Sequence, residues 1–89
     1  MTELDIAGPS EAIEYLEEIA HAMITLFPIA IDEANGRINR FFSGHQFVTA
    51  VEVSVLLHEE PEAWAKSVYY GENADWWLGE DGLEPLPYP

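Results

Sequence analysis

The chain has 89 residues, of which seventeen are Asp or Glu and three are Lys or Arg, so its formal net charge is −14. This balance argues against direct binding to nucleic acid or anionic lipid, because Lys and Arg supply the attraction to phosphate in both cases. Apolar residues make up 48% of the chain and aromatic residues 12%, which is sufficient for a single small domain spanning residues 1–89.

The first predicted element is a helix that begins near Pro9 and Ser10, where the serine offers an N-cap. Glu11 and Glu14 follow in the first turns, where the helix dipole favours acids. Apolar side chains then recur at helical spacing as far as residue 27. Pro28 interrupts the pattern, so we expect the helix to end there.

The segment 29–43 is compatible with two structures. Its apolar residues fit a helical stripe, and Ser43 with Gly44 fits a C-terminal stop. The dipeptide Asn35-Gly36 instead favours a hairpin between two strands. We favour the helix because the apolar spacing holds across the whole segment, although Gly36 inside a helix costs about 1 kcal/mol relative to alanine.

The segment 47–58 is ambiguous in the same way. Its alternating valines are typical of a strand, whereas Thr49 and Glu52 have the spacing of a capping box before an apolar run. In the helical interpretation Pro61 begins a further helix, which Gly71 closes. The sequence thus predicts a mainly α, single-domain bundle of about four helices. The alternative is an α+β fold, α-β-β-β-α, with a three-stranded antiparallel meander over residues 24–57.

The segment 72–89 differs from the rest of the chain because it is acidic, aromatic and rich in proline. We expect it to pack on the domain or to be partly extended. Asn73 could cap a single turn, but the prolines near the end forbid a terminal helix.

The two helices predicted after residue 48 resemble a helix-turn-helix in their residue pattern. The matching residues are Thr49, Glu52, Ser54, Leu56, Leu57, Trp64 and Val68. The resemblance implies two crossed helices, the second of which would read DNA. That second helix starts with Glu59, Glu60 and Glu62, and these carboxylates would face phosphates. We therefore expect the packing to carry over and the DNA-binding function not to.

A shorter stretch, from Tyr69 to Trp76, is similar to the barstar family of ribonuclease inhibitors. The matching residues are Tyr69, Tyr70, Gly71, Glu72, Asn73, Asp75 and Trp76. Members of that family close a basic nuclease site with an acidic helix and loop. They also need a parallel sheet, for which this chain does not have the order of elements, so the resemblance concerns the chemistry of an acidic, aromatic surface.

Glu11, Glu14 and Glu18 fall on one face of the first predicted helix, opposite its apolar side. Their spacing along the axis is about 4.5 to 6 Å, comparable to the separation of successive phosphates in a strand. For a single helix, a solvated face is the more common explanation. An ordinary exposed face, however, pairs Glu with Lys or Arg at i+4, and residues 1–22 hold six acids and no base.

Aromatic residues gather after residue 63 and alternate there with acids. Trp and Tyr are favoured interface anchors, and carboxylates around them would pair with a partner's Arg or Lys. Trp64 and one of the pair Trp76 and Trp77 are expected to complete the core instead, which leaves the other of the pair exposed. The predicted contacts are the acids Glu11, Glu14, Glu18, Glu59, Glu60, Glu62, Glu72 and Asp75, with Tyr70 and Trp76 as anchors.

Catalysis is not indicated. The chain has no cysteine and none of the common nucleophile, phosphate-loop or metalloprotease motifs. Glu17 and His21 share a helix face at i, i+4, which without further ligands favours a surface pair over a metal site. We expect no enzyme activity, no cofactor and no metal.

The sequence therefore predicts a small acidic inhibitor, of the anti-CRISPR or anti-restriction type, that mimics nucleic acid. Its partner would be a basic nucleic-acid-handling protein: a nuclease, CRISPR effector, restriction enzyme or repressor. One alternative is an antitoxin or immunity protein that neutralises a cognate toxin. Another is a structural or oligomerising domain of a salt-adapted organism, and a homodimer is compatible with either role. A cytoplasmic location is expected (the host cytoplasm for a phage protein), since no signal peptide or membrane span is recognisable.

Overall fold

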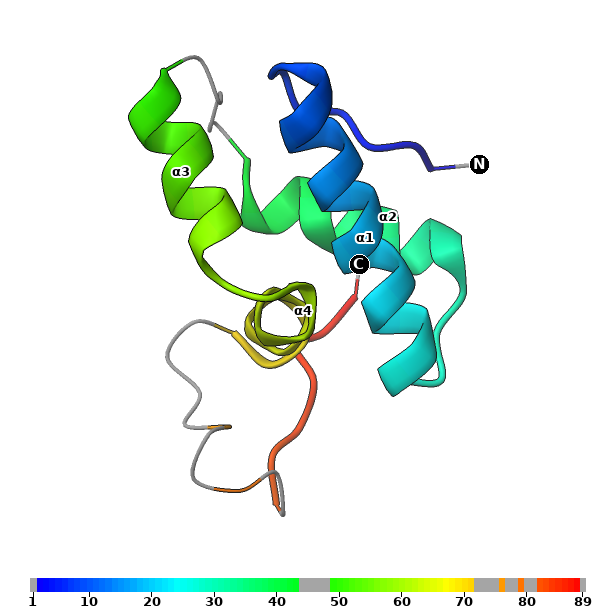
Figure 1. The fold of residues 1–89 in the computed structure, drawn as a ribbon. Coiled ribbons are helices and arrows are strands. Elements are labelled where there is room, and N and C mark those ends of the chain that lie inside the picture. Colours follow the sequence, from blue (N-terminus) through cyan, green and yellow to red (C-terminus); the bar gives the residue numbers. More distant parts are fainter. Residues whose placement is uncertain (1, 44–48, 72–75, 77–78, 80–81, 89) are drawn as a thin grey trace.

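The protein is a bundle of four helices in the computed structural model (Figure 1), which describes residues 2–43, 49–71, 76, 79 and 82–88. The helices are α1 (Ser10–Leu26), α2 (Ile31–Phe41), α3 (Ala50–His58) and α4 (Pro61–Tyr70). This confirms the predicted mainly α bundle. The alternative meander over residues 24–57 is wrong, because the described part of that segment is helical apart from its connections and contains no strand.

The start of α1 differs from the prediction by one residue. Pro9 occupies the N-cap position in an extended conformation, and no side chain caps the helix there. The Pro9 carbonyl accepts the first helical hydrogen bonds, from the backbone N–H groups of Ala12 and Ile13. Because the helix already includes Ser10, the serine hydroxyl does not serve as the predicted N-cap. At the other end, Phe27 is extended and Pro28 lies outside the helix, as predicted.

Helix α2 contains the Asn35-Gly36 dipeptide that favoured a hairpin. Two tertiary contacts explain why both residues suit a helix here. The Asn35 side-chain amide donates a hydrogen bond to the Thr2 carbonyl, 3.1 Å away. Gly36 is buried, and a β-carbon at this position would collide with the Tyr88 phenol. A glycine stands here because the Tyr88 ring needs the space, and not because a turn needs a positive φ at this position.

Local sequence signals correctly indicated the start of α3 and both ends of α4. Thr49 caps α3 through a complete capping box: its hydroxyl accepts from the Glu52 N–H, and the Glu52 carboxylate accepts from the Thr49 N–H. Pro61 opens α4, and Gly71 ends it with φ 104°. The two helices run in different directions, with α4 seen end-on in Figure 1 while α3 lies in the plane of the view. The close packing of one helix on the other that the helix-turn-helix resemblance implied is not found among the described residues, because α3 packs on α1 while α4 packs on α1 and α2. A hydrogen bond from the Trp64 indole to the Leu56 carbonyl links the two helices instead.

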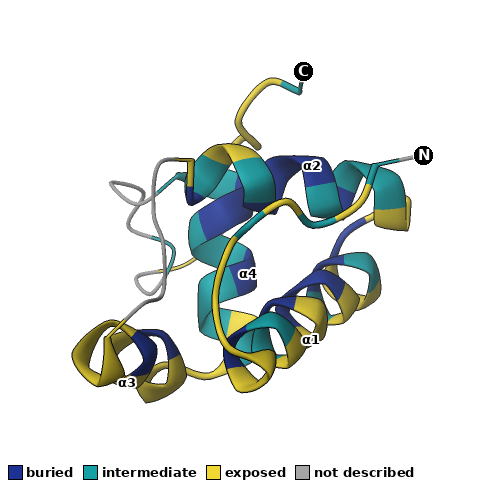
Figure 2. Ribbon diagram, turned by 90° about the horizontal axis from the view of Figure 1, so that it is seen from above, coloured by how far each residue is buried: buried dark blue, intermediate teal, exposed yellow. Residues whose placement is uncertain are grey.

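Helix α1 is the centre of the bundle and contacts each of the other three helices. Figure 2 shows its buried side turned toward α2 and α4, and α3 exposed over most of its surface. Each helix contributes buried apolar side chains to the core, and α2 also buries the charged Arg37. Its largest fully buried side chains are Leu16, Ile19, Met23, Ile38, Leu56 and Val68.

The N-terminal segment is tied to α2 by two asparagines one helical turn apart. Asn39 donates to the Glu3 carbonyl and accepts from the Asp5 N–H, both at 2.7 Å. Asn35 holds the Thr2 carbonyl in the same way. These amides act as backbone-like partners for an extended chain and satisfy groups that have no helical or sheet partner.

The end of the C-terminal segment packs against α2 and α4. The Leu86 N–H donates to the Tyr69 carbonyl at 2.8 Å, and Arg37 donates to the Leu86 carbonyl at 2.7 Å. Arg40 donates to the Pro87 carbonyl at 2.7 Å, and both guanidinium groups lie over the Tyr88 ring.

The turn predicted at Asn73 lies outside the described residues. Within the described part, no helix combines the length and apolarity needed to cross a membrane.

Candidate interaction surface

The acids predicted as contacts lie on the surface wherever the structure describes them. The exposed ones are Glu11, Glu14, Glu18, Glu59, Glu60 and Glu62. On the opposite side of α1, Leu16 and Ala20 are buried, so the predicted division of this helix into an acidic and an apolar face is correct. Glu72 and Asp75 lie outside the described residues.

The side chain of Tyr15 connects α1 to the turn between α3 and α4. Its hydroxyl donates a hydrogen bond to the backbone carbonyl of Glu59, which is 44 residues away in the chain. Tyr15 itself is only partly exposed. This contact brings the acidic face of α1 next to the acids at the start of α4.

Electrostatics at Tyr15 identify which acids lie together. Burial raises the pKa of the phenol, and the negative charges of nearby carboxylates raise it further. These carboxylates belong to Glu18, Glu60, Glu62 and Glu59, in decreasing order of effect. We call these four residues the Tyr15 cluster. The structure thus joins one acid of the predicted α1 row to all three of the predicted α4 acids.

Glu11 and Glu14 extend the acidic surface away from the Tyr15 cluster. On α1 they lie about two turns and about one turn before Glu18, respectively, and both are exposed. They contribute a row along the helix, whereas Glu18 lies where two separate parts of the chain meet.

The two helix ends at the Tyr15 cluster act on its negative charges in opposite ways. Glu62 lies in the first turn of α4, where the positive end of the helix dipole stabilises an acid. Glu59 lies at the C-cap of α3, where the negative end of that helix opposes one. Glu59 therefore lies at the helix end that disfavours an acid.

Both arginines of the chain have contacts away from the Tyr15 cluster. Arg37 is buried, forms a 2.8 Å ion pair with Glu33 and binds the C-terminal segment. Arg40 binds the same segment, and the Lys66 ammonium lies 5.4 Å from the centre of the Trp76 ring. The two arginines thus stabilise the fold instead of neutralising the Tyr15 cluster.

The two predicted aromatic anchors have different surroundings. Trp76 is half-buried and borders a surface hollow that also includes Glu59 and Trp64, so it lies beside the Tyr15 cluster. Tyr70 is at the far end of α4, about 15 Å along the axis from Glu60. Its half-buried ring packs against Phe27 and Tyr69, with centroids 5.6 and 5.1 Å apart. As predicted, Trp64 packs on the core; its indole N–H donates to the Leu56 carbonyl.

The role of Tyr15 was not predicted from the sequence. Tyr15 lies within one helical turn of both Glu11 and Glu18, so the helical period places it at the edge of the acidic face of α1. No local signal could indicate its contact with Glu59, because that contact depends on how α1 packs against the α3–α4 turn.

The described residues contain no group of three or more His, Asp or Glu side chains that could hold a metal ion. One open surface hollow is formed by Glu18 and His21 of α1 with Pro61 and Glu62 of α4. No protein-family model, no curated protein and no solved structure matches the chain.

Replacing Tyr15 with phenylalanine should lower the free energy of unfolding by about 1 kcal/mol at neutral pH, through loss of one hydrogen bond. Because the folded state raises the pKa of Tyr15, this stabilisation is complete below the ordinary tyrosine pKa of about 10 and is lost as the pH rises through the raised value. Urea unfolding from neutral to alkaline pH should show the two proteins converging. Glu18→Gln should move the convergence to lower pH, and identical pH profiles for wild type and Tyr15→Phe would contradict this assignment.

Proposed function

We propose that the protein is a non-enzymatic inhibitor that binds the basic nucleic-acid-binding surface of a target protein. The target class includes nucleases, CRISPR effectors, restriction enzymes and repressors, and the inhibitor would be of the anti-CRISPR or anti-restriction type that phages encode. In this proposal the protein presents carboxylates in place of phosphates and competes with nucleic acid.

The observation that supports the proposal most is the Tyr15 cluster. Glu18 comes from α1, while Glu59, Glu60 and Glu62 come from the α3–α4 turn and the start of α4. Like charges gathered on one side of a protein oppose folding, and Glu59 is in addition at the end of α3 that disfavours an acid. A protein that retains such repulsion while it uses its arginines elsewhere has a surface suited to a strongly basic partner.

The row formed by Glu11, Glu14 and Glu18 extends this surface. Its spacing of about 4.5 to 6 Å along the helix axis resembles that of phosphates along a nucleic-acid strand. With a net charge of −14, electrostatic steering would make association with a basic surface fast and sensitive to salt.

The proposal is tested by capture from host lysate with three immobilised proteins. These are the wild type, the charge-reversed variant Glu59→Lys/Glu60→Lys/Glu62→Lys, and a control with the same charge change, Glu3→Lys/Glu17→Lys/Glu84→Lys. The control residues are exposed and are not among the charges that act on Tyr15. Capture at about 0.05 M salt is followed by elution at about 0.5 M, where charges are screened within a few ångströms.

Wild type and control should capture a basic protein that the reversed variant does not, and the captured protein should lose its nucleic-acid binding when wild type is added. Reversal of Glu11, Glu14 and Glu18 should also weaken capture. If neither triple has any effect, the mimic proposal fails. A captured toxin whose active site, rather than its nucleic-acid surface, is covered would favour an antitoxin. Folding only in molar salt, without any partner, would favour a salt-adapted structural domain.

A further inference from the structure

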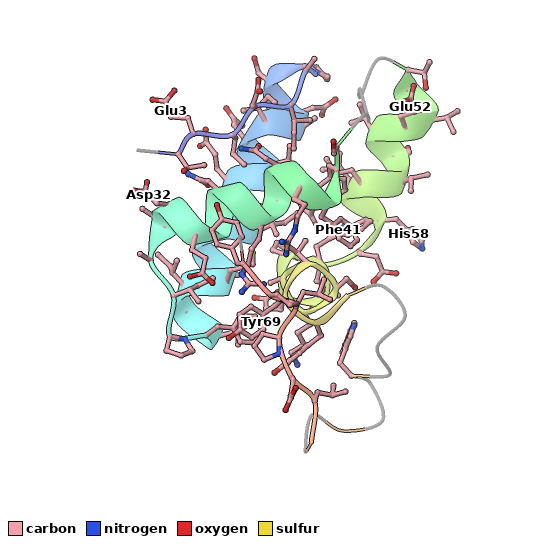
Figure 3. The ribbon with its side chains drawn as sticks, turned by 180° about the vertical axis from the view of Figure 1, so that it is seen from behind. Glu3, Asp32, Phe41, Glu52, His58 and Tyr69 are labelled. Carbon is pink, nitrogen blue, oxygen red and sulfur yellow. The ribbon has the colours of Figure 1, made fainter. Side chains whose placement is uncertain are left out.

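Helix α3 presents an apolar face to solvent. Val51 is 72% exposed and Val55 is 60% exposed, and the two lie one helical turn apart. They line one surface hollow together with Ala50, Ser54 and His58. Figure 3 shows Glu52 and His58 near opposite ends of this helix, with their side chains directed outward.

This face is the reverse of what a surface helix normally presents. Val53 and Leu56 anchor α3 on the core, so the other side should be polar. It carries the β-branched apolar residues Val51 and Val55 instead, although the chain is rich in acidic residues. The two neighbouring valines form an exposed apolar patch on which another apolar surface can pack.

The charges around this face indicate what kind of molecule fits it. Glu52 borders it on α3, and Glu59 and Glu60 follow directly after the end of the helix; all three are exposed. A second copy of the chain would bring another net charge of −14 against the same carboxylates. A basic partner would place its charges against them with favourable energy.

We infer that the exposed face of α3 docks an amphipathic helix of the basic partner. The apolar side of that helix packs on Val51 and Val55, and its Lys and Arg residues meet Glu52 and Glu59. This is the helix-against-helix form of peptide recognition, in which i, i+4 apolar residues anchor and flanking charges select. The inference rests on the proposed function and adds that the target contributes an apolar helix face as well as positive charge.

The test uses two synthetic peptides of the same leucine and lysine composition. In one, the leucines form a single helical face; in the other, they are spread around the helix. Fluorescence anisotropy measures the binding of each labelled peptide to wild type, to Val51→Ser/Val55→Ser and to the control Leu26→Ser/Ile31→Ser. The control pair is also apolar and exposed but lies on α1 and α2. Serine and valine have similar helix propensities, so the α3 variant should fold, which circular dichroism would verify.

Wild type and control should bind the amphipathic peptide at least about tenfold more tightly than the scrambled one, as burial of two valines implies. The Val51→Ser/Val55→Ser variant should lose that preference and retain the weaker, salt-sensitive binding of both peptides. Equal binding of the two peptides to wild type would overturn the inference and leave the proposed function intact. Binding of neither peptide at low salt would count against both. A dimer mass in light scattering that Val51→Ser/Val55→Ser abolishes would assign the face to a second copy and overturn the inference.

Discussion

Replacing Glu18, Glu59 and Glu60 with glutamine should weaken binding to the target by about 100-fold, the loss expected for about 0.9 kcal/mol per removed contact. The same variant should melt a few degrees higher than wild type at low salt. The reason is that all three carboxylates raise the pKa of the Tyr15 phenol and therefore gather around one side chain, and glutamine removes their charge while keeping their shape. Opposite effects on binding and stability are typical of side chains retained for function.

The control for this experiment is Glu3→Gln/Glu17→Gln/Glu84→Gln, which removes the same charge from exposed positions outside the Tyr15 cluster. Calorimetry should give the melting temperatures at about 0.05 M and about 0.5 M salt, and screening should reduce the difference at the higher concentration. Titration with the captured target should show wild-type affinity for the control. A cluster variant that binds as tightly as wild type would contradict the functional assignment, and one that melts lower would contradict the assumed repulsion.

Arg37→Ala should lower the free energy of unfolding by about 3 kcal/mol, a large fraction of the stability of so small a domain. Arg37 is 5% exposed, pairs with Glu33 at 2.8 Å and binds the Leu86 carbonyl. Its guanidinium also lies over the rings of Tyr69 and Tyr88. Removing it leaves a cavity, an unpaired carbonyl and a C-terminal segment without its main anchor.

Arg40→Ala is the matched comparison, because Arg40 also binds a carbonyl of the C-terminal segment and the Tyr88 ring. Arg40 is exposed, so water replaces its contacts and the variant should lose less than about 1 kcal/mol. Chemical unfolding measures both changes. Equal losses for the two variants would show that burial of Arg37 does not determine its contribution.

The four helices could be predicted because their limits are set by residues close in sequence. The capping box of Thr49 and Glu52, the prolines at 28 and 61 and Gly71 all act within a turn or two of the chain. The weaker predictions were those in which a local signal competed with packing. Asn35-Gly36 favours a turn by itself, but contacts with Thr2 and Tyr88 give both residues a place within α2.

The candidate surface was predictable in composition and not in arrangement. The acid excess and the exposed row on α1 follow from counting charges and applying the helical period. The meeting of Glu18 with Glu59, Glu60 and Glu62 does not, because nothing local relates residue 18 to residues more than forty positions later. The exposure of Val51 and Val55 could not be predicted either, because an apolar pattern does not show which residues the rest of the chain will cover.

The sequence by itself thus favoured the helical class over a meander, indicated the limits of several helices and fixed the net charge of −14. The tertiary structure decided where that charge is concentrated. Packing of α1 against α4 brings two acidic segments together at Tyr15, and docking of the C-terminal segment takes up Arg37 and Arg40. The physical reason is range: helix propensity and capping act over a few residues, whereas repulsion between carboxylates depends on distance in space and therefore on how the helices pack.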